Sequence, residues 1–434
     1  MTAVLADRST KELEALRDEV LRDYEAFKAR GLKLDMTRGK PSPEQLDLSL
    51  GMLTLPGNGD YVTEQNEDAR NYGGGPQGLP EARALLAEAL GAPLDQILVG
   101  NNSSLAVMHD AIVFALLKGV PGGAAPWVEQ KPIAFLCPVP GYDRHFAICQ
   151  EYGIRMIEVP MTGEGPDMDA VEEKVRDPSV KGMWCVPQFS NPSGETYSDE
   201  TVRRLGAMAT AAPDFRLFWD NAYAVHHLTE QRHKVANIFE ACKAGGHPDR
   251  PFVFASTSKV TFGGAGLGFF ASSPANVAWL VARMRRRSIG PDKLNQLRHV
   301  RFLRDAEGLY RLMDGHRAIL APKFRAVVDA LDTKLTGTGA ATWSRPEGGY
   351  FVTLDVMDGC AKRVVQLAGE AGVAMTAAGA TYPLGRDPND RTLRIAPSYS
   401  KLEDVRAAAE GIAICALVAA IELLLAKRSQ QAAR

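Results

Sequence analysis

The sequence predicts an α/β fold, with a mostly parallel sheet between helices in a large domain and a smaller α+β domain after it. Short apolar runs of strand character alternate with segments of helical hydrophobic spacing, which is the pattern of βαβ units. The runs predicted as strands of the large domain are 96–100, 133–137, 155–159, 183–187, 216–220, 252–255 and 268–271. Two later runs, 348–354 and 392–397, are expected in the small domain.

Several helices are expected around these strands. Ser9 and Glu12 form a capping-box pattern before a helical repeat, and residues 80–90 form another predicted helix. The stretch 295–331 is predicted to bridge the domains as helix, with breaks near Gly315 and Pro322. A C-terminal helix is expected from about Leu402. Its apolar part, 411–426, is interpreted as a core helix because it is short for a membrane span and contains Glu422.

Length and composition agree with two domains in one chain. The 434 residues are 45% hydrophobic, enough for a large core. The expected division is an N-terminal helix and arm, 1–55, packing with the small domain; a large domain, 56–300; and an interdomain helix with the small domain, 301–434.

Charge and cysteine usage narrow the class of protein. A net charge of −2 with 24% charged residues does not favour a nucleic-acid or membrane partner. The six cysteines are scattered without a Cys-x-x-Cys pair, which suits buried thiols in a reducing compartment. The first residues lack the apolar segment of a signal peptide. We therefore expect a cytoplasmic protein without a metal site.

Three motifs follow three predicted strands in succession. They are Asn-Pro-Ser-Gly at 191–194, Asp-Asn-Ala-Tyr at 220–223, and Ser-Thr-Ser-Lys at 256–259. Ligands of open α/β sheets bind beyond the carboxyl ends of the strands, so an amide, an acid with a phenol, and a lysine are expected together. A lysine shielded from water favours its neutral amine, which can form a Schiff base with an aldehyde. Taken singly, Lys259 reads equally as a surface lysine and Asp220 as a helix N-cap.

The order of these motifs resembles the fold-type I enzymes that use pyridoxal 5′-phosphate (PLP). The closest likeness is to a divergent bacterial subgroup of aspartate aminotransferases, and it extends from about Gly31 to the C-terminal helix. Further segments that carry it are 38–43, 288–293, 295–299, 341–343 and 348–351. The resemblance implies a seven-stranded sheet, PLP as the cofactor and a homodimer with shared active sites.

The resemblance implies a role for each residue around the cofactor ring. Lys259 would hold PLP and then move a proton between the substrate Cα and the cofactor. Asp220 would pair with the ring nitrogen and keep it protonated. Tyr223 and Asn191 would hydrogen-bond the ring hydroxyl, and Tyr142 would stack on the ring.

A second group of residues is implied at the phosphate. Ser103 and Ser104 begin a predicted helix after a strand, which is also an anion-binding arrangement on physical grounds. By resemblance Ser256 reaches the phosphate too, and Tyr72 reaches it in the neighbouring subunit. Better-known relatives have a phosphate-binding arginine near the position of Leu267. In this chain the phosphate would be held mainly by backbone N–H groups, hydroxyls and the helix end, or by a cation from elsewhere.

The substrate residues are also implied by the resemblance. Arg394 can grip a carboxylate with two parallel hydrogen bonds and corresponds to the residue that binds the substrate α-carboxylate. Gly39 would leave room for the amino acid, and Asn191 would lie beside it. The implied reaction transfers the amino group of L-aspartate to 2-oxoglutarate by a ping-pong mechanism. A cation for the distal carboxylate is not singled out among Arg38, Lys40, Arg144, Arg287 and Lys293.

Other functions remain open at this point. An aminotransferase of other or broad specificity would use the same residues, and so would a PLP-dependent lyase, decarboxylase or racemase. A non-catalytic PLP-binding regulator would need a basic DNA-binding module before the domain, and one capped helix in a nearly neutral chain does not supply it.

Overall fold

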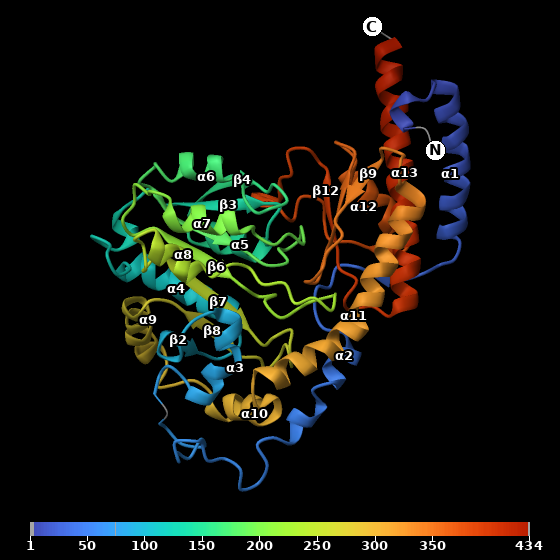
Figure 1. Ribbon diagram of the computed structural model, residues 1–434. Coiled ribbons are helices and arrows are strands. Elements are labelled where there is room, and N and C mark those ends of the chain that lie inside the picture. The colour runs from blue at the N-terminus through green and yellow to red at the C-terminus, as the bar shows by residue number, and fades with distance from the viewer. Residues whose placement is uncertain (1–3, 74, 433–434) are drawn as a thin grey trace.

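A computed structural model describes residues 4–73 and 75–432. Its centre is a seven-stranded sheet in the order β2-β8-β7-β6-β5-β3-β4 (Figure 1). Every neighbouring pair is parallel except those of β8, which runs antiparallel to β2 and β7. The strands are β2 (Ile97–Val99), β3 (Ala134–Val139), β4 (Arg155–Pro160), β5 (Val180–Cys185), β6 (Arg216–Asp220), β7 (Pro251–Ser256) and β8 (Gly268–Ala271). The predicted fold class is confirmed.

Helices cover both faces of this sheet, so side chains on both sides of each central strand are buried. Neighbouring residues of β6 show this, because Leu217 joins one hydrophobic core and Phe218 the other. One core lies under α4 (Ser104–Lys118), α5 (Asp143–Glu151) and α9 (Pro274–Arg287). The other lies under α3 (Pro80–Leu90), α6 (Met168–Lys174), α7 (Asp199–Ala207), α8 (Ile238–Ala244) and α10 (Lys293–Leu303).

The small domain has a core of its own around two short sheets. An antiparallel sheet contains β9 (Ala341–Trp343), β10 (Val352–Val356) and β12 (Thr392–Ile395), and a parallel pair contains β1 (Leu34–Asp35) and β11 (Val373–Ala374). The helices packed with them are α1 (Thr10–Lys28), α12 (Ala361–Glu370) and α13 (Leu402–Ala432). Short helices elsewhere are α2 (Pro43–Asp47) and the 3-10 turns Leu5–Asp7, Leu50–Thr54, Leu94–Gln96, Trp127–Glu129 and Pro383–Gly385.

The first and last helices of the chain, α1 and α13, pack together in this domain. Helix α1 begins with the predicted capping box of Ser9 and Glu12 and runs beside α13 (Figure 1). Helix α13 is long and apolar enough to cross a membrane by length and composition alone, but 72% of its most apolar window is buried inside the structure. It therefore packs as a core helix, as the sequence predicted.

The helical stretch between the domains differs from the prediction. The break lies at Arg304, where φ is +69°, and Asp305 then caps α11 (Ala306–Leu335) by accepting from Gly308 N–H. Helix α11 continues through Gly315 and Pro322, so the breaks predicted there are wrong. Leu320 and Phe324, on either side of the proline, are buried in the small-domain core, and this packing outweighs the missing backbone hydrogen bond.

A short antiparallel contact joins the large domain to the small one beside the sheet edge. His227 pairs with Gly348, and Gly349 N–H donates to the His226 carbonyl at 2.8 Å. The loop after β6 and the segment before β10 are therefore held together. The carboxyl ends of β5, β6 and β7 face this junction.

Candidate active site

A cavity of about 130 Å³ lies at the carboxyl ends of the parallel strands. Eight of the predicted site residues line it: Ser103, Ser104, Tyr142, Asn191, Asp220, Tyr223, Ser256 and Lys259. Leu105, Met108, Val186, Ala222 and Ser258 complete the lining. Segments that follow β2, β3, β5, β6 and β7 thus meet at one place, as expected for an α/β sheet.

Lys259 projects into this cavity from the turn that follows β7. Its side chain is enclosed by protein atoms on most sides and reaches solvent through the cavity. Desolvation lowers the pKa of the Lys259 amine below its ordinary value, and the charge of Asp220 opposes this only in part. Its Nζ lies 5.1 Å from the centre of the Tyr223 ring. The site therefore shifts the equilibrium of this amine toward its neutral form, which can act as nucleophile or base.

Asp220 is buried with its two oxygens in different situations. Oδ2 lies 3.0 Å from Nε2 of His145, whose ring is stacked on Trp184 at 4.2 Å. Oδ1 is buried and has no hydrogen-bond partner among the described residues. A buried carboxylate oxygen without a donor is costly, so this atom is suited to accept from a protonated ring nitrogen of a bound molecule.

The two tyrosines of the cavity remain protonated at ordinary pH. Burial, and secondarily the charge of Asp220, raises the pKa of Tyr142 to about 12. Burial also raises the pKa of Tyr223 well above its usual range. Their hydroxyls are therefore available as hydrogen-bond donors. The Tyr142 ring forms one wall of the cavity and meets His145 edge-on, with ring centres 4.9 Å apart.

Hydroxyl groups and the start of a helix also line the cavity. Ser103 is the N-cap of α4, yet its side chain makes no capping hydrogen bond. Ser258 Oγ donates to Asn102 Oδ1 at 3.0 Å, which holds the lysine turn against this helix start. Hydroxyls and the positive end of a 15-residue helix suit an anion. Ser256 lies at the same end of the sheet.

The glycine-rich loop after Lys259 packs behind this anion-binding end. A Cβ on Gly268 would lie 2.7 Å from the Ser103 carbonyl carbon, and one on Gly266 would lie 2.8 Å from Ser258 Oγ. Leu267, between them, is buried in the core. Among the described residues that line the cavity, Lys259 is the one basic side chain, so none of the other lining residues replaces the missing arginine as a cation.

Arg394 approaches the cavity from the small domain. It projects from β12, and its Nη1 lies 3.4 Å from Asn191 Oδ1 and 3.3 Å from Asp143 Oδ1. The guanidinium lies over the Phe351 ring at 4.9 Å, and Nε is buried without a partner among the described residues. One edge of the guanidinium thus remains available for a carboxylate.

Gly39 also lies on this side of the site, where it packs closely against Phe351. A Cβ at Gly39 would lie 2.3 Å from Cζ of Phe351. The glycine therefore allows the N-terminal segment to approach the ring that supports Arg394. That Gly39 also leaves room for a substrate stays a prediction.

Three of the five cations considered for a second carboxylate are already engaged. Arg38 pairs with Asp35 at 2.6 Å, and Arg287 pairs with Asp110 at 2.9 Å. Lys293 donates to the Gly73 carbonyl at 2.7 Å. For Lys40 and Arg144, no carboxylate partner is present in the part of the chain that the structure describes; Lys40 lies over the Tyr399 ring.

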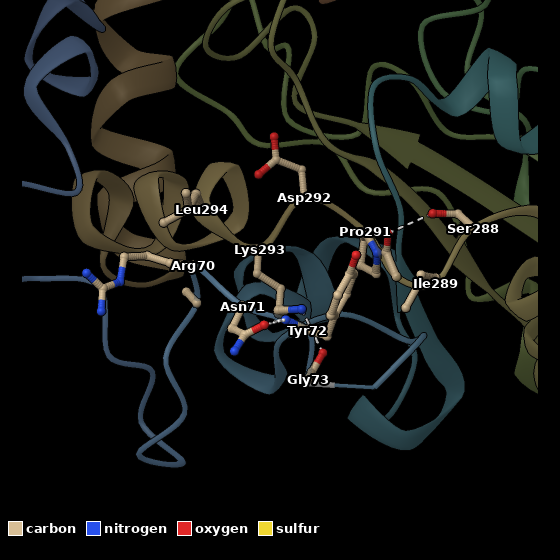
Figure 2. Close-up of a pocket in the computed structure, with 12 residues that line it drawn as sticks. Arg70, Asn71, Tyr72, Gly73, Ser288, Ile289, Pro291, Asp292, Lys293 and Leu294 are labelled. Atoms are coloured by element: carbon tan, nitrogen blue, oxygen red, sulfur yellow. Dashed lines mark hydrogen bonds between the residues drawn. The ribbon is translucent and has the colours of Figure 1, made fainter.

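Tyr72 is not brought to the cavity within one chain. Its side chain is 78% exposed and lines a separate hollow of about 610 Å³. Figure 2 shows this hollow between residues 69–73 and 288–294. Ile289, on its other side, is 72% exposed. Two large side chains are thus presented to solvent around one hollow.

Sequence reasoning missed two residues of the site. His145 supports Asp220, and its position one helical turn after Tyr142 could have indicated that both lie on the same side of the helix. Ser258 precedes Lys259 directly and was not given a role. No group of three His, Cys, Asp or Glu side chains within residues 4–73 and 75–432 is arranged to hold a metal ion.

The chain is similar over nearly its whole length to known aminotransferases. A family model described as aspartate amino-transferase matches residues 8–428. An aspartate aminotransferase of Corynebacterium glutamicum is 48% identical over 425 residues, which are 97% of this chain and 98% of the relative. The crystal structure of an aspartate transaminase from that species has a TM-score of 0.95 and 47% identity, covering 98% of this chain and 100% of the other. LysN, the alpha-aminoadipate aminotransferase of Thermus thermophilus complexed with N-(5'-phosphopyridoxyl)-L-leucine, shares the fold, with a TM-score of 0.69, 24% identity and coverage of 92% and 95%.

Proposed function

The chain belongs to the aspartate aminotransferase family, and we propose that this transaminase uses PLP to move the amino group of L-aspartate to 2-oxoglutarate in two half-reactions. The observation that carries the proposal is that Lys259 and Asp220 line one cavity, with the pKa of the amine lowered by burial and Asp220 Oδ1 without a partner among the described residues. The activity named for the Corynebacterium glutamicum relative supports aspartate as the donor.

The residues of the cavity fit PLP at three places. Asp220 Oδ1 would accept from the protonated ring nitrogen, and this would satisfy the orphaned oxygen. Tyr223 and Asn191 would bind the ring hydroxyl, while the Tyr142 ring would lie against the cofactor face. When bound, PLP supplies an aldehyde for a lysine amine and an electron-withdrawing ring that makes the substrate Cα acidic.

The phosphate would be held without an arginine. Ser103, Ser104, Ser256 and Ser258 offer hydroxyls, and the N-terminus of α4 offers backbone N–H groups and a partial positive charge. The close approach that Gly266 and Gly268 allow keeps these groups together.

Arg394 and Lys259 would divide the work on the substrate. Arg394 would bind the α-carboxylate through its free edge, with Asn191 fixing the other edge. This contact turns the Cα–H bond toward Lys259. The Lys259 amine, once neutral, would accept that proton and return it to the C4′ carbon of the cofactor, while the enclosed cavity limits the access of water.

We also propose a cytoplasmic homodimer in which Tyr72 completes the phosphate site of the partner. The exposure of Tyr72 and Ile289 around one hollow supports a protein contact there, since large apolar side chains grouped on a surface commonly mark interfaces (Figure 2). All six cysteines are buried and unpaired, which suits a reducing compartment.

Borohydride trapping tests the central assignment. The purified protein loaded with PLP is reduced, digested and mapped by mass spectrometry, together with Lys259→Ala and a control, Lys118→Ala, at an exposed position on α4. We expect the phosphopyridoxyl group on Lys259 in the parent and the control, and none in Lys259→Ala. An adduct retained on another lysine in Lys259→Ala would refute the assignment.

The substrate is tested separately by half-reactions. Each amino acid is mixed with the loaded enzyme, and conversion of the cofactor to its pyridoxamine form is followed by absorbance. Aspartate and glutamate should react fastest, with release of the matching 2-oxo acid. Release of CO2 in place of a 2-oxo acid would contradict a transaminase.

A further inference from the structure

Three buried polar side chains lie behind the turn that carries Lys259, outside the cavity. Gln45 comes from α2, His316 from α11, and Tyr350 from the segment just before β10. Each is at most 1% exposed. None of the three lines the site described above, so their hydrogen bonds require a separate explanation.

The hydrogen-bond directions in this cluster follow from a single backbone group. The Ser42 N–H can only donate, and it lies 3.0 Å from Gln45 Oε1. The oxygen of the amide is therefore on that side, and Nε2 faces the other two residues. Nε2 lies 2.8 Å from His316 Nδ1 and 3.0 Å from the Tyr350 hydroxyl. Both N–H bonds of the amide are thus used as donors.

These two hydrogen bonds determine where the protons of His316 and Tyr350 lie. His316 Nδ1 must accept, so the ring is neutral, in agreement with burial that lowers the pKa of His316 to about 4. The Tyr350 oxygen accepts from Gln45, so its own proton is directed elsewhere. The backbone carbonyl of Lys259 lies 3.4 Å from that hydroxyl and is its acceptor.

The cluster connects three parts of the molecule that are distant in sequence. Gln45 follows the N-terminal segment in which Gly39 touches Phe351, the ring beneath Arg394. Tyr350 adjoins Phe351 and contacts the His226 ring edge-on at 5.5 Å. A shift of the N-terminal segment or of the small domain would therefore change the hydrogen bond to the Lys259 carbonyl.

We propose that Gln45 and Tyr350 are positioning residues for Lys259, and that they couple the N-terminal segment and the small domain to the direction of the lysine amine. The inference rests on the proposed role of Lys259. Gln45 orients the Tyr350 hydroxyl, and the hydroxyl holds the Lys259 backbone. This carbonyl belongs to the residue that carries the reactive side chain. Movements of the N-terminal segment or of the small domain would reach the amine through it.

The first test replaces only the hydroxyl. Tyr350→Phe keeps the ring, and Tyr24→Phe is a matched control because the Tyr24 hydroxyl is also buried and donates to a backbone carbonyl, that of Leu367 at 3.0 Å. Loss of one such bond should lower kcat for aspartate about fivefold to tenfold, with KM changed less than twofold. It should also shift the pH midpoint of the absorbance change of bound PLP. Tyr24→Phe should move neither quantity.

The second test separates an effect that Gln45 exerts on Lys259 through the Tyr350 hydroxyl from general destabilisation of the fold. Gln45→Met should reproduce the kinetic and spectroscopic changes, and kcat of the double variant should be no lower than that of Tyr350→Phe alone, because Gln45 acts on Lys259 through the Tyr350 hydroxyl. Additive effects, or a Tyr350→Phe protein indistinguishable from Tyr24→Phe, would overturn the proposal. If circular dichroism shows that Tyr350→Phe is unfolded, the proposal is tested by comparing kcat and the pH midpoint of the absorbance change in Gln45→Met with those of the Tyr24→Phe control.

Failure of this inference can be told from failure of the proposed function. Borohydride reduction could give an adduct on Lys259 while Tyr350→Phe behaves like the parent. This result would contradict the positioning role of Gln45 and Tyr350 and would leave the assignment of Lys259 in place. An adduct on another lysine removes both.

Discussion

Oδ2 of Asp220 lies 3.0 Å from Nε2 of His145, and the His145 ring is stacked flat on Trp184. The contact anchors one oxygen of a buried carboxylate that lines the cavity, and it leaves Oδ1 without a partner among the described residues. An acid held at one oxygen has a defined orientation before any ligand arrives. The site is therefore prepared for a protonated nitrogen at one position.

Replacing the charge of Asp220 tests this arrangement. Asp220→Asn keeps the size of the side chain but removes the negative charge that would keep the ring nitrogen protonated. We expect kcat to fall about a hundredfold or more, as when one preorganised electrostatic group is removed from an active site. Single-turnover kinetics with aspartate measure it. Asp332→Asn, at an acid of the small domain paired with Arg345, is the control and should retain full activity; equal activities of the two variants would contradict the role of Asp220.

Arg394→Ala should separate substrate binding from cofactor binding. A charge-assisted bond to a carboxylate contributes about 1.5 to 3 kcal/mol, so KM for aspartate should rise about tenfold to a hundredfold. PLP affinity, measured by titrating the cofactor-free protein, should change little because Arg394 does not line the cavity. Arg391→Ala, just before the same strand and paired with Asp358 on the surface, should leave both quantities unchanged. A loss of PLP affinity equal to the loss of aspartate affinity would show that Arg394 acts on the fold.

Mixed dimers test the role of Tyr72 across subunits. A subunit with Tyr72→Phe and a subunit with Lys259→Ala are mixed after partial unfolding and refolded together. One site of the mixed dimer would contain an intact Lys259 and an intact Tyr72 from the partner. We therefore expect the mixture to recover activity at low PLP that neither parent shows. Absence of recovery, or full activity of a monomer in sedimentation, would remove the shared site.

Buried histidines predict how stability depends on pH. Nε2 of His299 lies 3.1 Å from Thr257 Oγ1 and 2.9 Å from Thr261 Oγ1 in the lysine turn, and desolvation lowers the pKa of His299 from 6.5 to about 4. Between those values the unfolded chain binds a proton that the folded protein does not, so stability rises with pH and is lost as pH falls from 6.5 toward 4. His316 behaves in the same way.

Denaturant unfolding at several pH values measures this effect. As pH falls from 6.5 toward 4, the free energy of unfolding should decrease by up to about 1.4 kcal/mol per pH unit for each such histidine. In His299→Gln, the free energy of unfolding should depend less steeply on pH, because unfolding then takes up about one proton fewer. His247→Gln, at a more exposed histidine, provides the comparison and should keep most of the slope of the parent. An unchanged slope in His299→Gln would contradict the assignment of a neutral buried ring.

The strand ends could be predicted from sequence because the pattern that defines them is local. Apolar runs set β5, β6 and β7, and the polar residue that ends each run must lie at the shared edge of a parallel sheet. Asn191, Asp220 and Lys259 were identified in this way, and they do line one cavity. The break predicted at Pro322 failed because burial of its neighbours, a tertiary effect, outweighed a local preference.

By itself, the sequence determined the fold class, the order of the motifs and the residue types available for chemistry, because these follow from periodicity and from the edge at which parallel strands end. Only the tertiary structure decided that His145 supports Asp220, that Gly39 packs against Phe351 and that Tyr350 reaches the Lys259 carbonyl. These contacts join segments far apart in the chain. They depend on how two hydrophobic cores pack together, and no local pattern of residues encodes that geometry.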